Sequence, residues 1–446
     1  MTPISSTSTA AVSEPDYAIT QLDNGLTVAA FPMPWLHETS VTLYVRAGSR
    51  FEQENEAGIA HFLEHMFFKG TKRIPDATRL HERLEELAAD MNASTGPESN
   101  SYWITLPPRF LSEGMTLFCE MFTQPHFGGL ENERQVILAE MREDENDAGE
   151  VNNAMVLGCA KLWENHPLGR PVIGYRECVS KFNKTDLTDY LQRHYRADNM
   201  AIAFCGPITL EEATELAREN LGALPGGAGE TTTTPPAMEP GPHWLAATDS
   251  GAQLGISLFF RGVGYRDADF FAMAALRRLL DDGFSARLQA QVREKKGLAY
   301  DLWAAISGYS DSGALEIGAS VEPEKLDALF ATVLEQLRLL RDEPPAPAEW
   351  RRLMTRWRAN MDSALDRPAE LMDRYVGDRL FAMEEPLSAA WERIEQLDPQ
   401  QIVAAAQKLF RPENLVTVVV GPNAQSHADR LKKQFSATLA GFSKPG

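Results

Sequence analysis

The sequence contains few cysteines and no long run of apolar residues. Its cysteines, Cys119, Cys159, Cys178 and Cys205, are widely spaced in a chain of 446 residues and form no C-x-x-C pair. This spacing argues against a disulfide framework or a cysteine-based metal site and predicts buried free thiols. No segment reaches the roughly eighteen apolar residues that a membrane-spanning helix needs. We therefore expect no membrane-embedded part.

Positive charge is also scarce. The chain has 43 basic and 63 acidic residues, a formal net charge of -20. Nucleic acids and anionic membranes bind positive surfaces, so neither is an expected partner. Residues 1–16 contain no basic residue and no apolar core, which argues against a secretory signal or a transit peptide. We expect these residues to form a disordered tail and the protein to be cytoplasmic, unless a targeting segment has been removed.

What the chain does contain is one unit used twice. Residues 41–46 (VTLYVR) align with 256–261 (ISLFFR), and 195–207 (YRADNMAIAFCGP) align with 410–422 (FRPENLVTVVVGP). Both alignments share one offset, since position 256 follows position 41 by the same interval as position 410 follows position 195. Two separate segments that agree in this way indicate an internal duplication.

A linker separates the two copies. Residues 226–242 are rich in Gly, Thr and Pro and have no apolar periodicity. We therefore predict a first domain over residues 17–225, which carries the catalytic groups described below, and a second domain over 243–440.

Each domain is expected to have an α+β fold. Strands are predicted at 25–30 and 40–45, and helices at 56–69, 77–89, 131–146 and 153–165. Because strands and helices are grouped rather than strictly alternating, we expect in each domain a mainly antiparallel sheet covered by helices.

The helix that ends before Gly70 carries a candidate metal site. Its apolar stripe includes Phe62, whereas His61, Glu64 and His65 lie together on another face. Histidines at positions i and i+4 can bring two imidazole nitrogens to one Zn²⁺. Glu64 lies beside them, where it can accept a proton from a water molecule at the metal. H-x-x-E-H is known as a catalytic zinc arrangement, although two helix histidines are often only surface residues.

A catalytic zinc needs a third protein ligand. The helix predicted over 131–146 offers Glu133 and Glu140, two turns apart on one face, and Glu143 one turn further on. The pattern alone does not select among these three carboxylates. Such a ligand would distinguish a metal site from a chance pair of histidines.

The second copy serves as an internal control. Depending on the register, the residues equivalent to the three site positions are Ala274, Arg277 and Arg278, or Leu276, Leu279 and Leu280. Neither register retains a metal ligand. The duplicated half therefore has the scaffold without the site, and we expect one zinc ion per chain.

Several motifs in order resemble the pitrilysin/insulinase family, in particular its short branch of mitochondrial-processing-peptidase-like enzymes. The resemblance covers nearly the whole chain. The matching segments are LDNGLTV (22–28), AGIAHFLEHMFFKGT (57–71), ERQVILAEM (133–141), HPLGRPVIG (166–174) and FSARLQAQVREKKGLAY (284–300).

The resemblance implies roles that spacing left open. It implies that Glu140 is the third zinc ligand, that Glu133 is a supporting carboxylate and that Glu64 is the general base. It implies that the substrate peptide adds as a further strand to an edge strand containing Asn92 and Ala93.

In the second half, Arg293 and Tyr300 match the family's substrate-contacting Arg/Tyr pair. The chain departs from the family where Ala88 and Ala89 replace the usual glycines, and it lacks the glycine-rich loop of the mitochondrial enzyme's partner subunit.

We therefore expect a zinc-dependent endopeptidase that hydrolyses unfolded peptides or leader segments. Long members of the family carry four such domains in one chain, so a chain of two implies a homodimer that encloses a chamber, or a heterodimer with a related subunit. The alternatives are a non-catalytic scaffold subunit, which the intact motif disfavours, and a half-enzyme that needs a partner subunit. The presence of both Arg293 and Tyr300 disfavours the second alternative.

Overall fold

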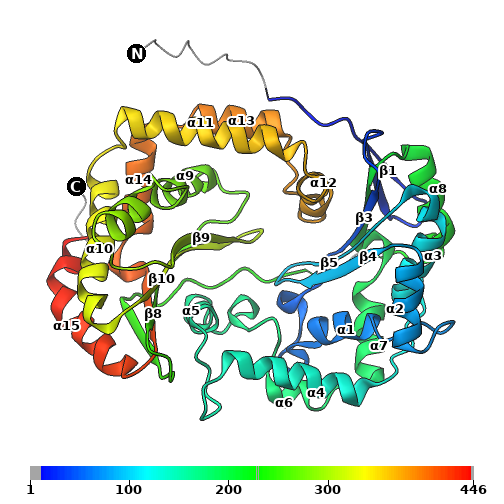
Figure 1. Cartoon of the computed structure of the whole chain (residues 1–446), viewed down its shortest axis with the longest axis horizontal. Coiled ribbons are helices and arrows are strands. Elements are labelled where there is room, and N and C mark those ends of the chain that lie inside the picture. Colours follow the sequence, from blue (N-terminus) through cyan, green and yellow to red (C-terminus); the bar gives the residue numbers. More distant parts are fainter. Residues whose placement is uncertain (1–11, 228, 230, 443–446) are drawn as a thin grey trace.

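A computed structural model describes residues 12–227, 229 and 231–442 of the chain. Figure 1 shows two sheets on opposite sides of the molecule, each with helices on its outer side. Helices α11 and α13 extend along one side of the molecule, and α4, α5 and α6 lie on the opposite side. The predicted α+β fold of two duplicated halves is confirmed.

The first half contains a six-stranded sheet in the order β1-β2-β6-β3-β5-β4. Its neighbouring strands are antiparallel except for the parallel pair β2 and β6. The strands are β1 (Ala18–Gln21), β2 (Thr27–Pro32), β3 (Thr39–Val45), β4 (Asp90–Thr95), β5 (Asn100–Leu106) and β6 (Met200–Gly206). The helices are α1 (Ile59–Phe67), α2 (Ala77–Glu86), α3 (Leu111–Thr123), α4 (Leu130–Glu140), α5 (Ala154–Leu162), α6 (Arg176–Val179), α7 (Lys184–His194) and α8 (Leu210–Leu221).

The second half contains a five-stranded sheet in the order β7-β11-β8-β10-β9. Only β7 and β11 are parallel neighbours in this sheet. The strands are β7 (His243–Ala247), β8 (Leu254–Gly262), β9 (Leu302–Gly308), β10 (Gly313–Val321) and β11 (Leu415–Val420). The helices are α9 (Phe270–Leu280), α10 (Leu326–Asp342), α11 (Pro347–Ala364), α12 (Pro368–Met372), α13 (Leu387–Glu395), α14 (Pro399–Leu409) and α15 (Ala424–Gly441).

The strand register repeats at the offset found in the sequence. Val41 in β3 lies opposite Phe204 in β6, and their equivalents in the second copy, Ile256 in β8 and Val419 in β11, also lie opposite each other. The pairing of β3 with β5 recurs, in the same shifted register, between β8 and β10. Because a slip of one residue would turn every side chain to the other face, this agreement supports duplication of a whole sheet.

A buried hydrogen-bond motif repeats as well. The side-chain amide of Asn199 donates to the carbonyl oxygens of Arg46 and His194, both at 2.7 Å. Its equivalent, Asn414, donates at 2.9 Å to the carbonyl oxygens of the equivalent residues, Arg261 and Leu409. In both copies one side-chain amide therefore donates to a carbonyl oxygen at the end of a helix and to another at the end of a central strand.

The two halves pack by exchanging one segment each. Phe31 and Tyr44, on the first sheet, share a hydrophobic core with Tyr375. Tyr375 belongs to the single π-helical turn Asp373–Gly377 that continues α12. In return, α5 of the first half packs on β8 of the second. The two elements approach closely at Gly158, where a Cβ atom would lie only 2.4 Å from the ring of Phe259. The segment α12 has the place of α5 in the second copy, so each copy covers the other's sheet with the same element.

Some expected boundaries are wrong. The helix predicted from residue 56 begins at Ile59, because residues 54–56 form a separate 3-10 turn and Gly58 adopts a left-handed conformation with φ 96°. The helix predicted over 131–146 ends as an α-helix at Glu140 and continues as a 3-10 turn over Met141–Asp144.

The predicted disordered tail also needs correction. Residues 1–11 lie outside the described part of the chain, but residues 12–16 do not form a free tail. Val12 is buried in the second core, and the Glu14 carboxylate accepts hydrogen bonds from the Tyr375 hydroxyl and the Ser388 N–H. An apolar contact and a satisfied carboxylate fix this segment against the second half.

The cysteine prediction holds in part. All four thiols are free, but only Cys119 and Cys205 are buried, whereas Cys159 and Cys178 are partly exposed. Across residues 12–442, apart from 228 and 230, no helix is long and apolar enough to cross a bilayer.

Candidate metal centre

Helix α1 presents its polar residues away from the core of the first half. Ile59, Phe62, Leu63 and Met66 are fully buried, as the apolar stripe predicts. The start of the helix is fixed by the buried carboxylate of Glu52, which accepts the N–H groups of Gly58 and Ala60, both at 2.9 Å. These two hydrogen bonds satisfy N–H groups that have no partner within the helix.

Two helices bring three possible ligand side chains together. The Nε2 atom of His61 lies 3.7 Å from one carboxylate oxygen of Glu140, and the Nε2 atom of His65 lies 3.6 Å from the other. Within the described residues this is the one group of three or more His, Cys, Asp or Glu side chains whose ligand atoms converge. Of the three carboxylates that the sequence left open, the structure joins Glu140 directly to both histidines.

The spacing of these atoms fits a shared metal ion. The separations are too long for hydrogen bonds, whose N···O distance is about 2.7–3.2 Å. Ligands at about 2.1 Å around a tetrahedral zinc stand roughly 3.4 Å apart. Two imidazoles and one carboxylate are also the donor set of known catalytic zinc sites. The residues therefore fit zinc.

The charges around Glu140 also favour a cation. Burial raises the pKa of its carboxyl; the neighbouring His65 opposes this rise, and the carboxylates of Glu143 and Glu64 add to it. Burial, together with the neighbouring His65, lowers the pKa of His61 to about 4. His61 is therefore neutral at physiological pH, the form that binds a metal.

Glu133 supports His65 from behind. Its carboxylate lies 2.8 Å from Nδ1 of His65 and 2.7 Å from Nζ of Lys69. Burial alone would raise the pKa of Glu133, but the hydrogen bonds with His65 and Lys69 hold it below its ordinary value. An ionised Glu133 accepts a hydrogen bond from Nδ1–H of His65, which leaves the Nε2 lone pair of His65 facing the metal position.

Glu64 lies beside the ligands but does not belong to the converging group. The hydroxyl of Thr95 donates a hydrogen bond to its carboxylate. Burial raises the pKa of Glu64, and the hydrogen bond from Thr95 opposes that rise. A carboxyl with a raised pKa is a stronger base, which suits general base chemistry near neutral pH.

A cavity of about 540 Å³ opens beside this group. His61, Glu140 and Thr95 line it from the first half, and Tyr309 lines it from the second. Further lining comes from apolar side chains of α5 and the segment after it, including Met155, Val156, Leu168 and Ile173.

Asn92 and Ala93 lie on β4, the outermost strand of the first sheet. This strand pairs with β5 on one side, and no described strand pairs with its other side. The N–H of Ala93 donates to the side-chain oxygen of Asn92 at 2.9 Å. Thr95, which contacts Glu64, ends the same strand.

Arg293 and Tyr300 lie together but do not line this cavity. The guanidinium of Arg293 lies 4.6 Å from the ring centre of Tyr300 and 5.7 Å from that of Phe284. Tyr300 is 82% exposed and Phe284 is 74% exposed. Arg293 lies on a π-helical turn, and Tyr300 lies shortly before β9.

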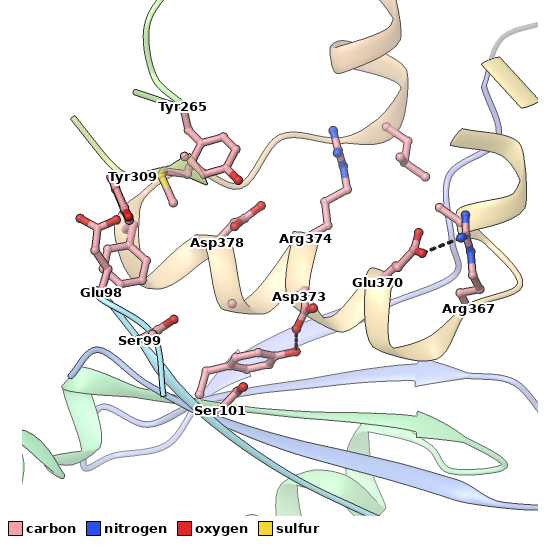
Figure 2. A pocket seen from close by; sticks show the side chains of 18 of the residues that line it. Glu98, Ser99, Ser101, Tyr265, Tyr309, Arg367, Glu370, Asp373, Arg374 and Asp378 are labelled. Carbon is pink, nitrogen blue, oxygen red and sulfur yellow. Dashed lines mark hydrogen bonds and ion pairs between the residues drawn. The ribbon is translucent and has the colours of Figure 1, made fainter. Parts of the chain in front are cut away.

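A second cavity of about 750 Å³ lies between β5 and the α12 segment. Its lining includes Ser99 and Ser101 from the first half and Asp373, Arg374 and Asp378 from the turns that follow α12. In Figure 2, Asp373 points toward the strand that carries Ser101, whereas Arg374 points to the opposite side. Burial raises the pKa of Asp378 to about 7. Both cavities are lined by Pro97 and Tyr309, so they meet at the tip of the β4–β5 hairpin.

Sequence reasoning did not identify Lys69, Thr95 or Glu52. Lys69 follows His65 by one helical turn, a spacing that places both on one face and could have indicated it. Thr95 and Glu52 reach the site only through tertiary folding, and local spacing carries no signal for them.

Two family models match consecutive parts of the chain. Residues 29–176 match the model of the insulinase family, peptidase family M16, and residues 181–356 match the peptidase M16 inactive domain. The first match contains the three converging ligands, whereas the second runs from the last part of the first half across the linker into the second half.

Relatives match nearly the whole chain. A Rickettsia bellii protein described as an uncharacterized zinc protease is 28% identical over 92% of this chain and 98% of its own length. A probable mitochondrial-processing peptidase subunit beta of Schizosaccharomyces pombe is 27% identical over 425 residues.

Solved structures share the fold. A protease of Helicobacter pylori has a TM-score of 0.82 at 22% identity and is covered completely, over 92% of this chain. A periplasmic protease of Escherichia coli has a TM-score of 0.76 at 22% identity, and this chain spans 51% of it.

Proposed function

The chain belongs to the insulinase family of peptidases, family M16, and on this premise we propose that it is a zinc-dependent endopeptidase. The observation that carries the proposal is the convergence of His61, His65 and Glu140 at distances suited to one metal ion. Glu64 lies next to this group, which supports its role as general base.

The residues divide the work of peptide hydrolysis between them. His61, His65 and Glu140 hold the ion, and Glu133 orients His65. When bound, zinc supplies a Lewis acid that polarises the peptide carbonyl and acidifies water. The Glu64 carboxylate takes a proton from the attacking water and returns it to the nitrogen of the leaving amine.

We propose unfolded peptides or leader segments as substrates. The cavity beside the ligands has a volume of about 540 Å³, which admits a few side chains but no folded protein. The free side of β4 suits the addition of an extended peptide strand, with Asn92 and Ala93 along its path.

We further propose that two copies complete each other's sites. Tyr300 is exposed, Arg293 is half-buried against its ring, and neither residue lines the cavity of the ligands. Large aromatic side chains with such exposure are common at protein interfaces. In this arrangement Tyr300 of one chain donates a hydrogen bond to the substrate carbonyl, or to the oxyanion that develops from it, in the site of the other.

The test uses Glu64→Gln, which removes the proton acceptor and keeps nearly the same shape. Wild-type protein, the variant and chelator-treated protein are incubated with a peptide library, and zinc content is measured in each. We expect the variant to retain zinc and lose cleavage, and zinc to restore the chelated protein. Normal cleavage by Glu64→Gln would refute the assignment of the base.

A further inference from the structure

The second half of the chain contacts the β4–β5 hairpin directly. Glu98, in the turn of this hairpin, is buried, and its carboxylate accepts the N–H of Ser310 at 2.8 Å and the hydroxyl of Ser310 at 2.6 Å. Figure 2 shows Glu98 next to Tyr309. The hairpin that lines the metal cavity is thus held by a turn of the other half.

Arg50 joins the two sides of this contact. Its side chain is fully buried and donates to Glu98 at 2.6 Å and to both carboxylate oxygens of Asp311 at 2.8 Å. It also donates to the carbonyl oxygen of Thr233 in the linker at 2.7 Å. We call Arg50, Glu98, Ser310 and Asp311 the hairpin clamp.

The turn that carries Ser310 and Asp311 is fixed by a second anchor. The indole N–H of Trp163 donates to the hydroxyl of Ser312 at 2.9 Å, and the ring of Trp163 lies 5.2 Å from that of Tyr309. Trp163 is fully buried and follows α5, which packs on the second sheet. The turn therefore has little freedom to move away from the hairpin.

The β4–β5 hairpin connects the hairpin clamp to Glu64, the proposed general base. Thr95, three residues before Glu98, contacts the carboxylate of Glu64. The side-chain amide of Asn100 donates to the Thr95 oxygen at 2.9 Å. An amide N–H₂ group can only donate, so the Thr95 proton is directed to Glu64, and the direction of this hydrogen bond is fixed.

We propose that Thr95 is a positioning residue for Glu64, and that the second half keeps it in place through the hairpin clamp. The inference rests on the proposed function, because it concerns the orientation of the base in that reaction. A general base must lie within hydrogen-bond reach of the proton it removes, and small displacements are costly. The half without metal ligands thereby acquires a role in the reaction.

The first test compares Thr95→Val with Thr95→Ser. Valine keeps the shape and removes the hydroxyl, whereas serine keeps the hydroxyl. We expect Thr95→Val to lower kcat at least tenfold, about the effect of losing one hydrogen bond to a charged group. KM and zinc content stay at wild-type values, and Thr95→Ser restores most of the rate. Equal kcat in Thr95→Val and wild type would overturn the proposal.

The second test is a double-mutant cycle between the halves. Asp311→Asn breaks the ion pair with Arg50, and Ser310→Ala provides a milder second variant. We expect Asp311→Asn to lower kcat with KM and zinc content unchanged, and to have little further effect in the Thr95→Val background. If the double variant lowers kcat by the product of the two single-variant factors, Asp311 does not act through Thr95.

The control is a variant that removes an ion pair of the second half outside the hairpin clamp. Lys408 lies 2.6 Å from Asp269, and Lys408→Met is expected to leave kcat at the wild-type value. Glu64→Gln separates the two hypotheses. Normal cleavage by Glu64→Gln refutes the proposed function. If Glu64→Gln is inactive but Thr95→Val has the wild-type kcat, only the positioning role of Thr95 is refuted.

Discussion

At the scale of single residues, the least expected feature of the site is the charge behind His65. Lys69 lies just after the end of α1, four residues beyond His65, and forms an ion pair with Glu133 at 2.7 Å. Glu133 in turn contacts Nδ1 of His65 at 2.8 Å. The three side chains form a row that ends at the metal position.

We predict that Lys69→Met weakens zinc binding. Without the ammonium group, the carboxylate of Glu133 is less stabilised in its charged form and less well oriented. The hydrogen bond between Glu133 and His65, which orients the imidazole ring, is therefore weakened. Changes behind a metal ligand typically cost about 10–100-fold in affinity. Competition with a chromophoric chelator measures the change, and Lys69→Arg is expected to retain most of the affinity. Unchanged affinity in Lys69→Met would exclude the row as a functional unit.

A second residue-scale prediction concerns acid stability. His194 is fully buried, and neither of its ring nitrogens has a hydrogen-bond partner among the described residues. Burial, with the neighbouring charge of Arg193, lowers its pKa to about 4. Because the unfolded chain binds this proton near pH 6.5, folding stability falls as the pH falls below that value.

Urea unfolding of wild type and His194→Leu at several pH values measures this effect. Between pH 7.5 and pH 5 we expect the wild type to lose about 2 kcal/mol relative to the variant. A stability difference that stays constant over this range would mean that His194 is not held neutral in the folded protein.

The residues also show what spacing can and cannot predict. His61, Glu64 and His65 share one helix, so a period of 3.6 residues suffices to place them together. The choice of Glu140 over Glu133 and Glu143 depends on how α4 crosses α1, which no local pattern fixes. Here the family resemblance pointed to Glu140, and the structure places Glu140 between the two histidines.

At the scale of secondary-structure elements, the proposed function links substrate binding and catalysis through β4. Its outer side has no partner strand in the described chain, and its last residue, Thr95, contacts Glu64. A peptide that adds to this strand therefore passes close to the base.

We predict that Ala93→Pro weakens substrate binding. Proline removes the N–H group of Ala93, which a strand added to β4 would use, and proline is tolerated on edge strands. Loss of this hydrogen bond is expected to raise KM by about tenfold while zinc content stays unchanged. Ala93→Val keeps the N–H and suits a strand, so it serves as the control. Equal KM values for the two variants would argue against strand addition.

The sequence predicted most elements but not the exchange between them. Repeated strands follow from the alignment of the two halves, and the structure repeats them in the same register. The crossing of α5 and the α12 segment onto the opposite sheets had no counterpart in the prediction, because amphipathic patterns show that a face is buried but not against what. The tail prediction failed at Val12 and Glu14 for the same reason.

At the scale of the whole molecule, the proposed function requires that Arg293 and Tyr300 reach a substrate. Both lie outside the cavity of His61 and Glu140, and Tyr300 is almost fully exposed. We therefore predict complementation between chains. Glu64→Gln and Tyr300→Phe, each impaired alone, are mixed in equal amounts and allowed to exchange subunits.

With random exchange, half of the dimers contain one chain of each variant. In such a dimer, one of the two sites combines an intact Glu64 from one chain with an intact Tyr300 from the other. The mixture is therefore expected to recover about one quarter of the wild-type rate. A mixture that stays at the mean of the two separate variants would show that Tyr300 acts within its own chain or not at all. Mixing Glu64→Gln with Glu140→Gln, whose changes fall in the same proposed site, provides the negative control.

The proposed chemistry depends above all on one zinc ion held by His61, His65 and Glu140, and anomalous X-ray diffraction at the zinc absorption edge tests this assignment most directly. We predict a single anomalous peak per chain, within coordination distance of Nε2 of His61, Nε2 of His65 and the Glu140 carboxylate. A zinc-loaded crystal with no peak there, or with its zinc bound to other residues, would contradict the assignment.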